Sequence, residues 1–209
     1  MAEAKASSDG GVRAPRETKE QAKAANSNLA VRIATAAIGT PLILLLLYKG
    51  APWGFYLLAL PATLVAAWEL FSMTHPGDRP SQLMGVGMAA VTSAATYFED
   101  GDARIIVTTM ICVPLAGPLL TLVRLGDMKT AALRACAMGF GPLFVGVPVT
   151  LLAMIRRDLG DAGAGFVVLA IMFAWFGDTG GYFAGRFLGR HKLYEAVSPK
   201  KTVEGAIGG

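Results

Sequence analysis

A carboxylate within a long apolar segment is the least expected feature of this sequence. Asp178 lies in the apolar segment 165–184. An ionised carboxylate at bilayer depth costs ~2.5–3.5 kcal/mol on insertion scales, so such a group usually faces a bundle interior or a wet cavity and has a functional role. If the segment is helical, Asp178, Tyr182 and Arg186 are four residues apart and share one face. That face presents a carboxylate, a phenol and a guanidinium in the same direction.

Four glycines form a second row beside this face, from within the segment to just past its end. Gly177, Gly181, Gly185 and Gly189 are each four residues apart. Small residues at this spacing allow another helix, or a ligand, to approach the backbone closely. The row therefore predicts a close contact along one side of this helix.

A basic, glycine-rich tail follows. Its cationic side chains alternate with hydroxyl residues and glycines: Arg186, Arg190, His191, Lys192, Ser198, Lys200, Lys201, Thr202, Gly205, Gly208 and Gly209. Cations and hydroxyls bind phosphate, and glycines allow backbone N–H groups to close on an anion. The run Lys-Lys-Thr is similar to the end of a P-loop, but the full pattern GxxxxGK[ST] is absent. A carboxylate beside a polyphosphate-binding segment indicates a divalent metal between the two.

Three runs in this region resemble the motifs of the phosphatidate cytidylyltransferases, also called CDP-diacylglycerol synthases. They are DTGGYF at 178–183, GRFLGRHKL at 185–193 and SPKKTVEG at 198–205, followed by Gly208 and Gly209. The family commonly has DTGAYFxGRxFGKHKL and SPKKTWEGxxGG, so this chain differs at Gly181, Leu188, Arg190 and Val203. The likeness to family motifs covers roughly the last 35 residues, and the rest of the chain fits a membrane bundle.

The resemblance implies a membrane enzyme of phospholipid biosynthesis that transfers CMP from CTP to phosphatidic acid and releases pyrophosphate. It implies Mg²⁺ as the cofactor, held by Asp178, with Asp178 and Lys201 as the catalytic residues. Arg186 is expected to pair with a phosphate or with Asp178. The expected substrate-binding residues are Tyr182, Arg186, Lys192, Ser198, Lys200, Thr202, Glu204 and Glu69.

The family also has a C-terminal signature, K-R…K-D…P-G-H-G-G…D-R-x-D, which does not occur in this sequence. We therefore expect the chain to be the N-terminal two-thirds of such an enzyme, truncated at its C-terminus and catalytically incomplete alone.

Other interpretations of the same residues stay open. Asp178 could be a structural carboxylate paired with Arg186 or a tyrosine, and Lys200 and Lys201 could bind anionic lipid headgroups at the membrane surface. The whole chain could be another CTP-dependent lipid enzyme, of the polyprenol kinase or CDP-archaeol synthase type. It could also be a non-catalytic transporter or scaffold.

Three further ionisable residues have simpler explanations. Glu69 follows Trp68 near the end of an apolar segment, where it is either an interfacial glutamate or part of the cavity wall. His75 lies in a loop and is expected to be solvated. His191 is expected to be a bystander within the matched GRHKL run.

Composition places the chain among multi-spanning membrane proteins. Of its 209 residues, 54% are apolar and only 16% are charged, and the mean hydropathy is +0.50. We predict an all-α, polytopic transmembrane bundle of about six helices, with no nucleic-acid partner and with a homodimer as one way to bury its helix faces. The apolar segments are 30–48, 53–73, 83–98, 105–123, 135–155 and 165–184, of which 83–98 is the least secure because it is short.

Two regions follow from this pattern: a polar tail at 1–28, disordered or loosely helical, and a transmembrane cytidylyltransferase-like domain at 29–209. Most of the 19 lysines and arginines fall on one side of the predicted membrane if the N-terminus is cytoplasmic. Four fall on the other side, namely Lys49, Arg104, Arg156 and Arg157, and the Arg156–Arg157 pair is the one misfit. The charge distribution predicts an inner-membrane protein with both the N-terminus and the C-terminal tail in the cytoplasm.

Overall fold

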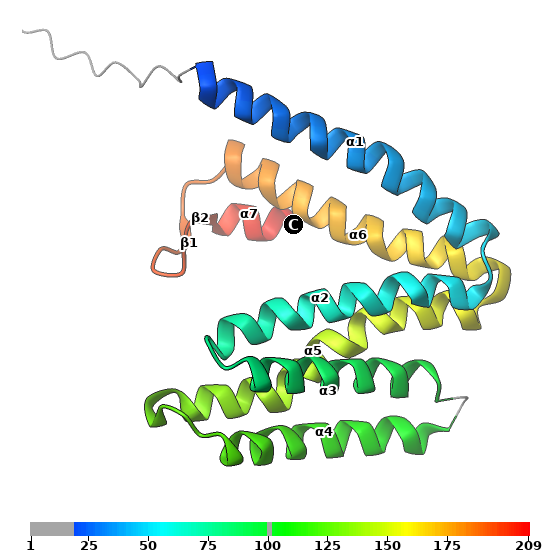
Figure 1. The fold of residues 1–209 in the computed structure, drawn as a ribbon. Coiled ribbons are helices and arrows are strands. Elements are labelled where there is room, and N and C mark those ends of the chain that lie inside the picture. Colours follow the sequence, from blue (N-terminus) through cyan, green and yellow to red (C-terminus); the bar gives the residue numbers. More distant parts are fainter. Residues whose placement is uncertain (1–18, 100–101) are drawn as a thin grey trace, which may run out of the picture. The chain divides into compact units, whose positions relative to one another are not determined.

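The computed structural model describes residues 19–99 and 102–209, which form seven α-helices, one 3-10 turn and two short strands (Figure 1). The chain divides into two compact units, 1–45 and 46–209. Helix α1 (Lys19–Lys49) provides the described part of the first unit and ends in the second. The predicted tail at 1–28 lies partly outside the described residues, and its cytoplasmic location stays a prediction.

The six predicted apolar segments correspond to six helices. They are α1, α2 (Tyr56–Thr74, preceded by the 3-10 turn η1, Pro52–Phe55), α3 (Arg79–Tyr97), α4 (Ala103–Val123), α5 (Met128–Asp158) and α6 (Gly160–Phe187). In the described residues, four stretches are long and apolar enough to cross a membrane: Pro52–Thr74, Ala103–Val123, Met128–Asp158 and Gly160–Phe187. The chain is therefore an all-α, polytopic membrane bundle, as predicted.

Two of the six helices fall short of the criteria for a membrane span. The described apolar part of α1, Ala34–Lys49, is shorter than the other spans. Helix α3 buries several polar side chains, including Gln82, Thr92 and Ser93. Because α3 packs against α2, α5 and α4, these polar groups face protein. This placement explains why 83–98 is the weakest span in the sequence.

Helix α5 is central to the second unit, since it packs against α2, α3, α4 and α6. Glycines bring the backbones of these helices close together. A Cβ on Gly117 of α4 would collide with the backbone carbonyl oxygen of Met138, and a Cβ on Gly146 of α5 would lie 3.0 Å from the carbonyl oxygen of Ala89. Consecutive helices from α2 to α5 run antiparallel, so the α2–α3 and α4–α5 connections share one end (Figure 1).

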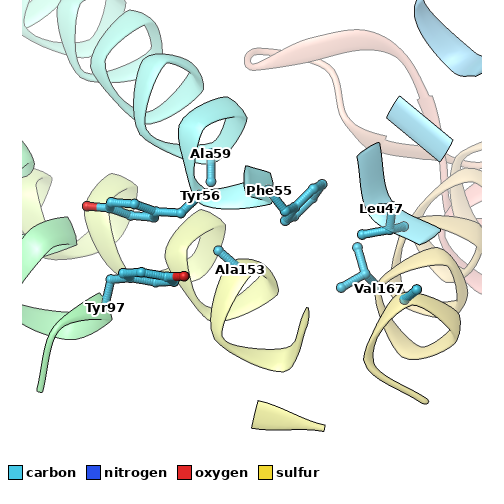
Figure 2. Close-up of a cluster of buried hydrophobic side chains, with 8 residues drawn as sticks. Leu47, Phe55, Tyr56, Ala59, Tyr97, Ala153 and Val167 are labelled. Carbon is cyan, nitrogen blue, oxygen red and sulfur yellow. The ribbon is translucent and has the colours of Figure 1, made fainter. Parts of the chain in front are cut away.

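Two stacked tyrosines form part of the core between α2, α3 and α5. The rings of Tyr56 and Tyr97 are 3.9 Å apart and nearly parallel, with their hydroxyls at opposite ends (Figure 2). The Tyr56 hydroxyl lies 3.3 Å from Ser93 Oγ, which lies 2.6 Å from Thr150 Oγ1. Thr150 in turn donates to the carbonyl oxygen of Gly146. The hydroxyls of Tyr56, Ser93 and Thr150 thus find partners within the protein, as an apolar environment requires, whereas the buried Tyr97 hydroxyl has no partner among the described residues.

The two arginines that did not fit the predicted charge distribution are used inside the protein. The Arg156 side chain is buried, and its Nε and a terminal nitrogen donate to the carbonyl oxygens of Leu47 and Gly50, at 2.6 and 3.2 Å. The last carbonyls of a helix have no partner within it, so Arg156 satisfies groups left open at the end of α1. Arg157 pairs with Asp158 and donates to the backbone oxygen of Tyr97.

The prediction that His75 is solvated is wrong. His75 is only 1% exposed, and its Nδ1 lies 3.0 Å from Thr74 Oγ1. The neighbouring Asp78 forms ion pairs with Arg134 and Arg124 at 2.8 and 3.1 Å. A short hydrogen bond from the Ser81 hydroxyl, followed by the contact with Arg124, lowers the pKa of Asp78 despite its partial burial. This ion-pair cluster joins the α2–α3 and α4–α5 connections.

Close packing between α4 and α5 leads to a stability prediction. Gly117→Ala should lower the free energy of unfolding by ~1–3 kcal/mol, because the added methyl meets the Met138 carbonyl and the two helices must separate. Gly87→Ala on α3 is the matched control, since its Cβ would have no neighbour within 4 Å. Thermal unfolding in detergent measures both. Equal melting temperatures for the two variants would contradict this packing.

Candidate functional site

The basic tail folds into a small hairpin and a terminal helix. Strand β1 (Lys192–Tyr194) pairs antiparallel with β2 (Ser198–Thr202), and helix α7 (Val203–Gly208) follows directly. These strands were not predicted from the sequence. They are short and almost fully exposed, so they lack the alternating apolar pattern that identifies a strand.

Helix α7 packs against α6 along the predicted glycine row (Figure 1). A Cβ on Gly181 would lie 3.1 Å from the carbonyl oxygen of Gly205, and a Cβ on Gly205 would lie 3.0 Å from that of Gly181. One turn away, a Cβ on Gly209 would lie 2.9 Å from the carbonyl oxygen of Gly177. The expected close contact is confirmed, and its partner is another helix of the same chain.

A cavity of about 810 Å³ lies between α6, the hairpin and α7. It brings together seven of the predicted site residues, three from α6 and four from β2: Asp178, Tyr182, Arg186, Ser198, Lys200, Lys201 and Thr202. Segments 178–186 and 198–202 therefore form one site. The cavity also contacts apolar residues of α6, Phe173 and Ala174, at its other end along the helix.

Asp178 is available for a ligand. In the described part of the chain its carboxylate is exposed and has no hydrogen bond or ion pair. Arg186 does not pair with it. Instead, a terminal nitrogen of Arg186 donates to the Tyr182 hydroxyl at 2.7 Å, and the guanidinium lies 5.9 Å from the centre of that ring. The structural alternative, an Asp178–Arg186 ion pair, is therefore not formed.

Lys200 and Lys201 are also available. Both side chains are exposed, and no carboxylate within the described residues pairs with either of them. Thr202 has a second role as the N-cap of α7, since its Oγ1 accepts from the backbone N–H of Gly205 at 3.1 Å. Two free cations thus face the same cavity as a free carboxylate.

Three predicted substrate-binding residues do not line this cavity. Lys192 donates across the hairpin to the backbone oxygen of Pro199. Glu204 accepts from the backbone N–H groups of Arg190 and His191 and from His191 Nδ1. Glu69 is exposed on α2 and does not contact the cavity. The side chains of Lys192 and Glu204 therefore hold the hairpin.

Hydrogen bonds to the Glu204 carboxylate change its acidity. Its own backbone N–H, then His191 and the neighbouring amides, lower the pKa of Glu204 from 4.5 to about 2. A carboxyl whose pKa is lower in the folded protein stabilises the fold above its unfolded-state pKa. That contribution is complete above pH ~4.5 and is lost as the pH falls towards 2.

Four cavity residues were not predicted: Phe173, Ala174, Leu193 and Ala206. The first two continue the helical rows already recognised, since Ala174 lies four residues before Asp178 and Phe173 four before Gly177. Extending those rows backwards would have found them. Leu193 and Ala206 depend on the hairpin and on α7, for which the sequence carried no signal.

The described residues contain no cluster of three or more histidine, cysteine or acidic side chains that could bind a metal by itself. Mg²⁺ does not need such a cluster, because one or two carboxylates usually hold it together with substrate phosphates and water. A lone free carboxylate beside two lysines suits that arrangement. Asp178 therefore fits Mg²⁺ as part of a nucleotide complex.

The α6–α7 contact leads to a second stability prediction. A Cβ on Gly180 would collide with the backbone carbonyl oxygen of Gly208, so Gly180→Ala should displace α7. Gly165→Ala on the same helix is the control, because its Cβ would have no neighbour within 4 Å. Hydrogen exchange of 203–208 should become faster in the first variant alone. Unchanged protection in both would contradict the close contact.

Comparisons with known proteins agree with the motif resemblance. The chain is 29% identical over 186 residues to the phosphatidate cytidylyltransferase of Staphylococcus saprophyticus, a match that covers 86% of this chain and 66% of that protein. Its identity to the Staphylococcus haemolyticus enzyme of the same name is 39% over 66 residues, or 32% of this chain and 24% of that protein. The chain thus spans just under two-thirds of the first relative's length.

No solved structure gives a significant match. The model of the cytidylyltransferase family matches residues 30–209, which include every helix from α2 onwards and the whole candidate site. This chain belongs to the cytidylyltransferase family.

Proposed function

We propose that this chain carries the nucleotide-binding side of a phosphatidate cytidylyltransferase. The observation that carries this proposal is one cavity lined by Asp178 of α6 and by Lys200 and Lys201 of β2, none of which is paired with another described residue. The name that both staphylococcal relatives carry supports the same activity. In the reaction, a phosphate oxygen of phosphatidic acid attacks the α-phosphorus of CTP. The bond from that phosphorus to the β-phosphate oxygen breaks, and pyrophosphate leaves.

The side chains of the cavity suit this chemistry because phosphoryl-type transfer needs positioning and charge neutralisation more than covalent help. Lys200 and Lys201 bind the triphosphate, and the Ser198 hydroxyl donates to it. Arg186, oriented by Tyr182, faces the cavity and binds a phosphate of either substrate. Asp178 holds Mg²⁺, which when bound neutralises charge on the phosphates.

The position of the cavity suits one lipid substrate and one dissolved substrate. One end of the cavity is lined by Phe173 and Ala174, which lie on an apolar helix long enough to span the membrane. The lysines of the cavity lie on an exposed hairpin beyond that helix. An amphiphile could keep its acyl chains beside α6 while its phosphate reaches the lysines. The lysine and arginine distribution supports an inner-membrane protein whose hairpin faces the cytoplasm. CTP is dissolved in the cytoplasm and could reach the lysines from there.

Substrate choice tests the activity directly. The full-length protein in liposomes should convert phosphatidate and CTP to CDP-diacylglycerol and pyrophosphate, and should not phosphorylate a polyprenol. Chromatography of radiolabelled lipid separates these products. A phosphorylated polyprenol, or no lipid product from folded protein, would contradict the proposed function.

The role of Asp178 gives a further prediction. Asp178→Asn in the full-length protein should lower turnover by about 10²- to 10³-fold, because the uncharged amide binds Mg²⁺ poorly. Asp161→Asn is the matched control, since Asp161 is an exposed carboxylate at the other end of the same helix. Steady-state assays over a Mg²⁺ series measure the effect. Normal turnover of Asp178→Asn with normal metal dependence would refute the metal-binding role.

A further inference from the structure

The loop between α6 and α7 is closed at its base by Glu204. One carboxylate oxygen accepts from the backbone N–H of Arg190 at 3.1 Å, and the other lies 2.7 Å from His191 Nδ1. The backbone N–H of Val203 also donates to the carbonyl oxygen of His191 at 2.9 Å. The residues just after α6 are therefore joined to the first residues of α7.

Everything between these two points is the hairpin that carries the cavity lysines. Its strands bury almost no side chains: β1 is exposed throughout, and only the two ends of β2 are half-buried. Hydrophobic burial therefore contributes little to fixing its position. The strand pairing orders the hairpin internally, and contacts at its base fix it relative to α6: those of Glu204, and that of Thr202 beside Gly185 and Gly189.

Glu204 is suited to this role because its carboxylate is ionised over the physiological pH range, since its pKa is about 2. Hydrogen bonds to an ionised acceptor are about twice as strong as those between neutral groups. The charged groups next to this carboxylate in the described structure are Arg190 and His191. Both oxygens are occupied by protein donors, which leaves Glu204 poorly placed to bind substrate directly.

We propose that Glu204 is a positioning residue: by holding the base of the hairpin, it sets Lys200 and Lys201 opposite Asp178 for binding of the nucleotide phosphates. This inference rests on the proposed function for the identity of the ligand. It assigns Glu204 an indirect role, in place of the substrate contact that the sequence suggested.

The first experiment measures the hairpin itself, without nucleotide. Hydrogen exchange of 190–202 in the full-length protein should become faster in Glu204→Ala, while α2 to α5 keep their protection. The matched control is Glu195→Ala, which removes the same charge from the exposed turn of the same hairpin, where Glu195 has no hydrogen bond to other described residues. Unchanged exchange in Glu204→Ala would overturn the proposal.

The second experiment asks whether Glu204 acts through the lysines. Glu204→Ala should raise the KM for CTP by about tenfold and leave the KM for phosphatidate unchanged, whereas Glu195→Ala should alter neither. In a Lys200→Ala/Lys201→Ala background, Glu204→Ala should change the KM for CTP by less than about twofold, because residues that act as a unit are not additive. Equal effects in both backgrounds would mean that Glu204 only stabilises the fold, which would overturn its positioning role.

These two experiments separate the inference from the proposed function. If the wild-type protein does not use CTP, the proposed function fails together with the nucleotide part of this inference. Hydrogen exchange still decides, in that case, whether Glu204 holds the hairpin.

Discussion

The candidate site depends on the backbone contact between α6 and α7. Glycines on both helices allow carbonyl oxygens of one to lie where a side chain of the other would stand, as between Gly181 and Gly205. Side chains on either helix would hold them farther apart. Because β2 leads directly into α7, the position of α7 against α6 also determines where the lysines of β2 lie relative to Asp178.

The rest of the second unit provides the rigid support that this contact needs. Helix α5 packs against four other helices, among them α6. Its glycines allow close packing, and its buried Thr150 hydroxyl is hydrogen-bonded to Ser93 and to the carbonyl oxygen of Gly146. Arginines serve the same purpose at the helix ends. Arg156 satisfies carbonyls at the end of α1, and Arg134 joins two connections through Asp78. These buried cations explain basic residues that a charge count would assign to solvent or lipid headgroups.

In the cavity and in the hairpin and helix beside it, the charged groups divide into two kinds. Arg186, Lys192 and Glu204 are hydrogen-bonded to the protein, whereas Asp178, Lys200 and Lys201 are not paired with other described residues. Leaving opposite charges unpaired in one cavity is consistent with a ligand that binds both, such as a metal-bound polyphosphate. The hydrogen bonds of Lys192 and Glu204 hold the hairpin and so keep Lys200 and Lys201 in place. A flexible hairpin would instead lose binding energy to conformational entropy.

The sequence alone determined the class of the fold and most of the cavity residues. Apolar length requires helices in a membrane, and a period of four places Asp178, Tyr182 and Arg186 on one face wherever that helix forms. The glycine row likewise predicted a close contact. Only the tertiary structure showed that α7 packs against the glycine row and that the tail forms a hairpin, because an exposed three-residue strand leaves no periodic signal. It also decided that His75 is buried and that Glu204 and Lys192 bind the hairpin, since hydrogen-bond partners 7 to 14 residues away are chosen by the folded loop and not by spacing.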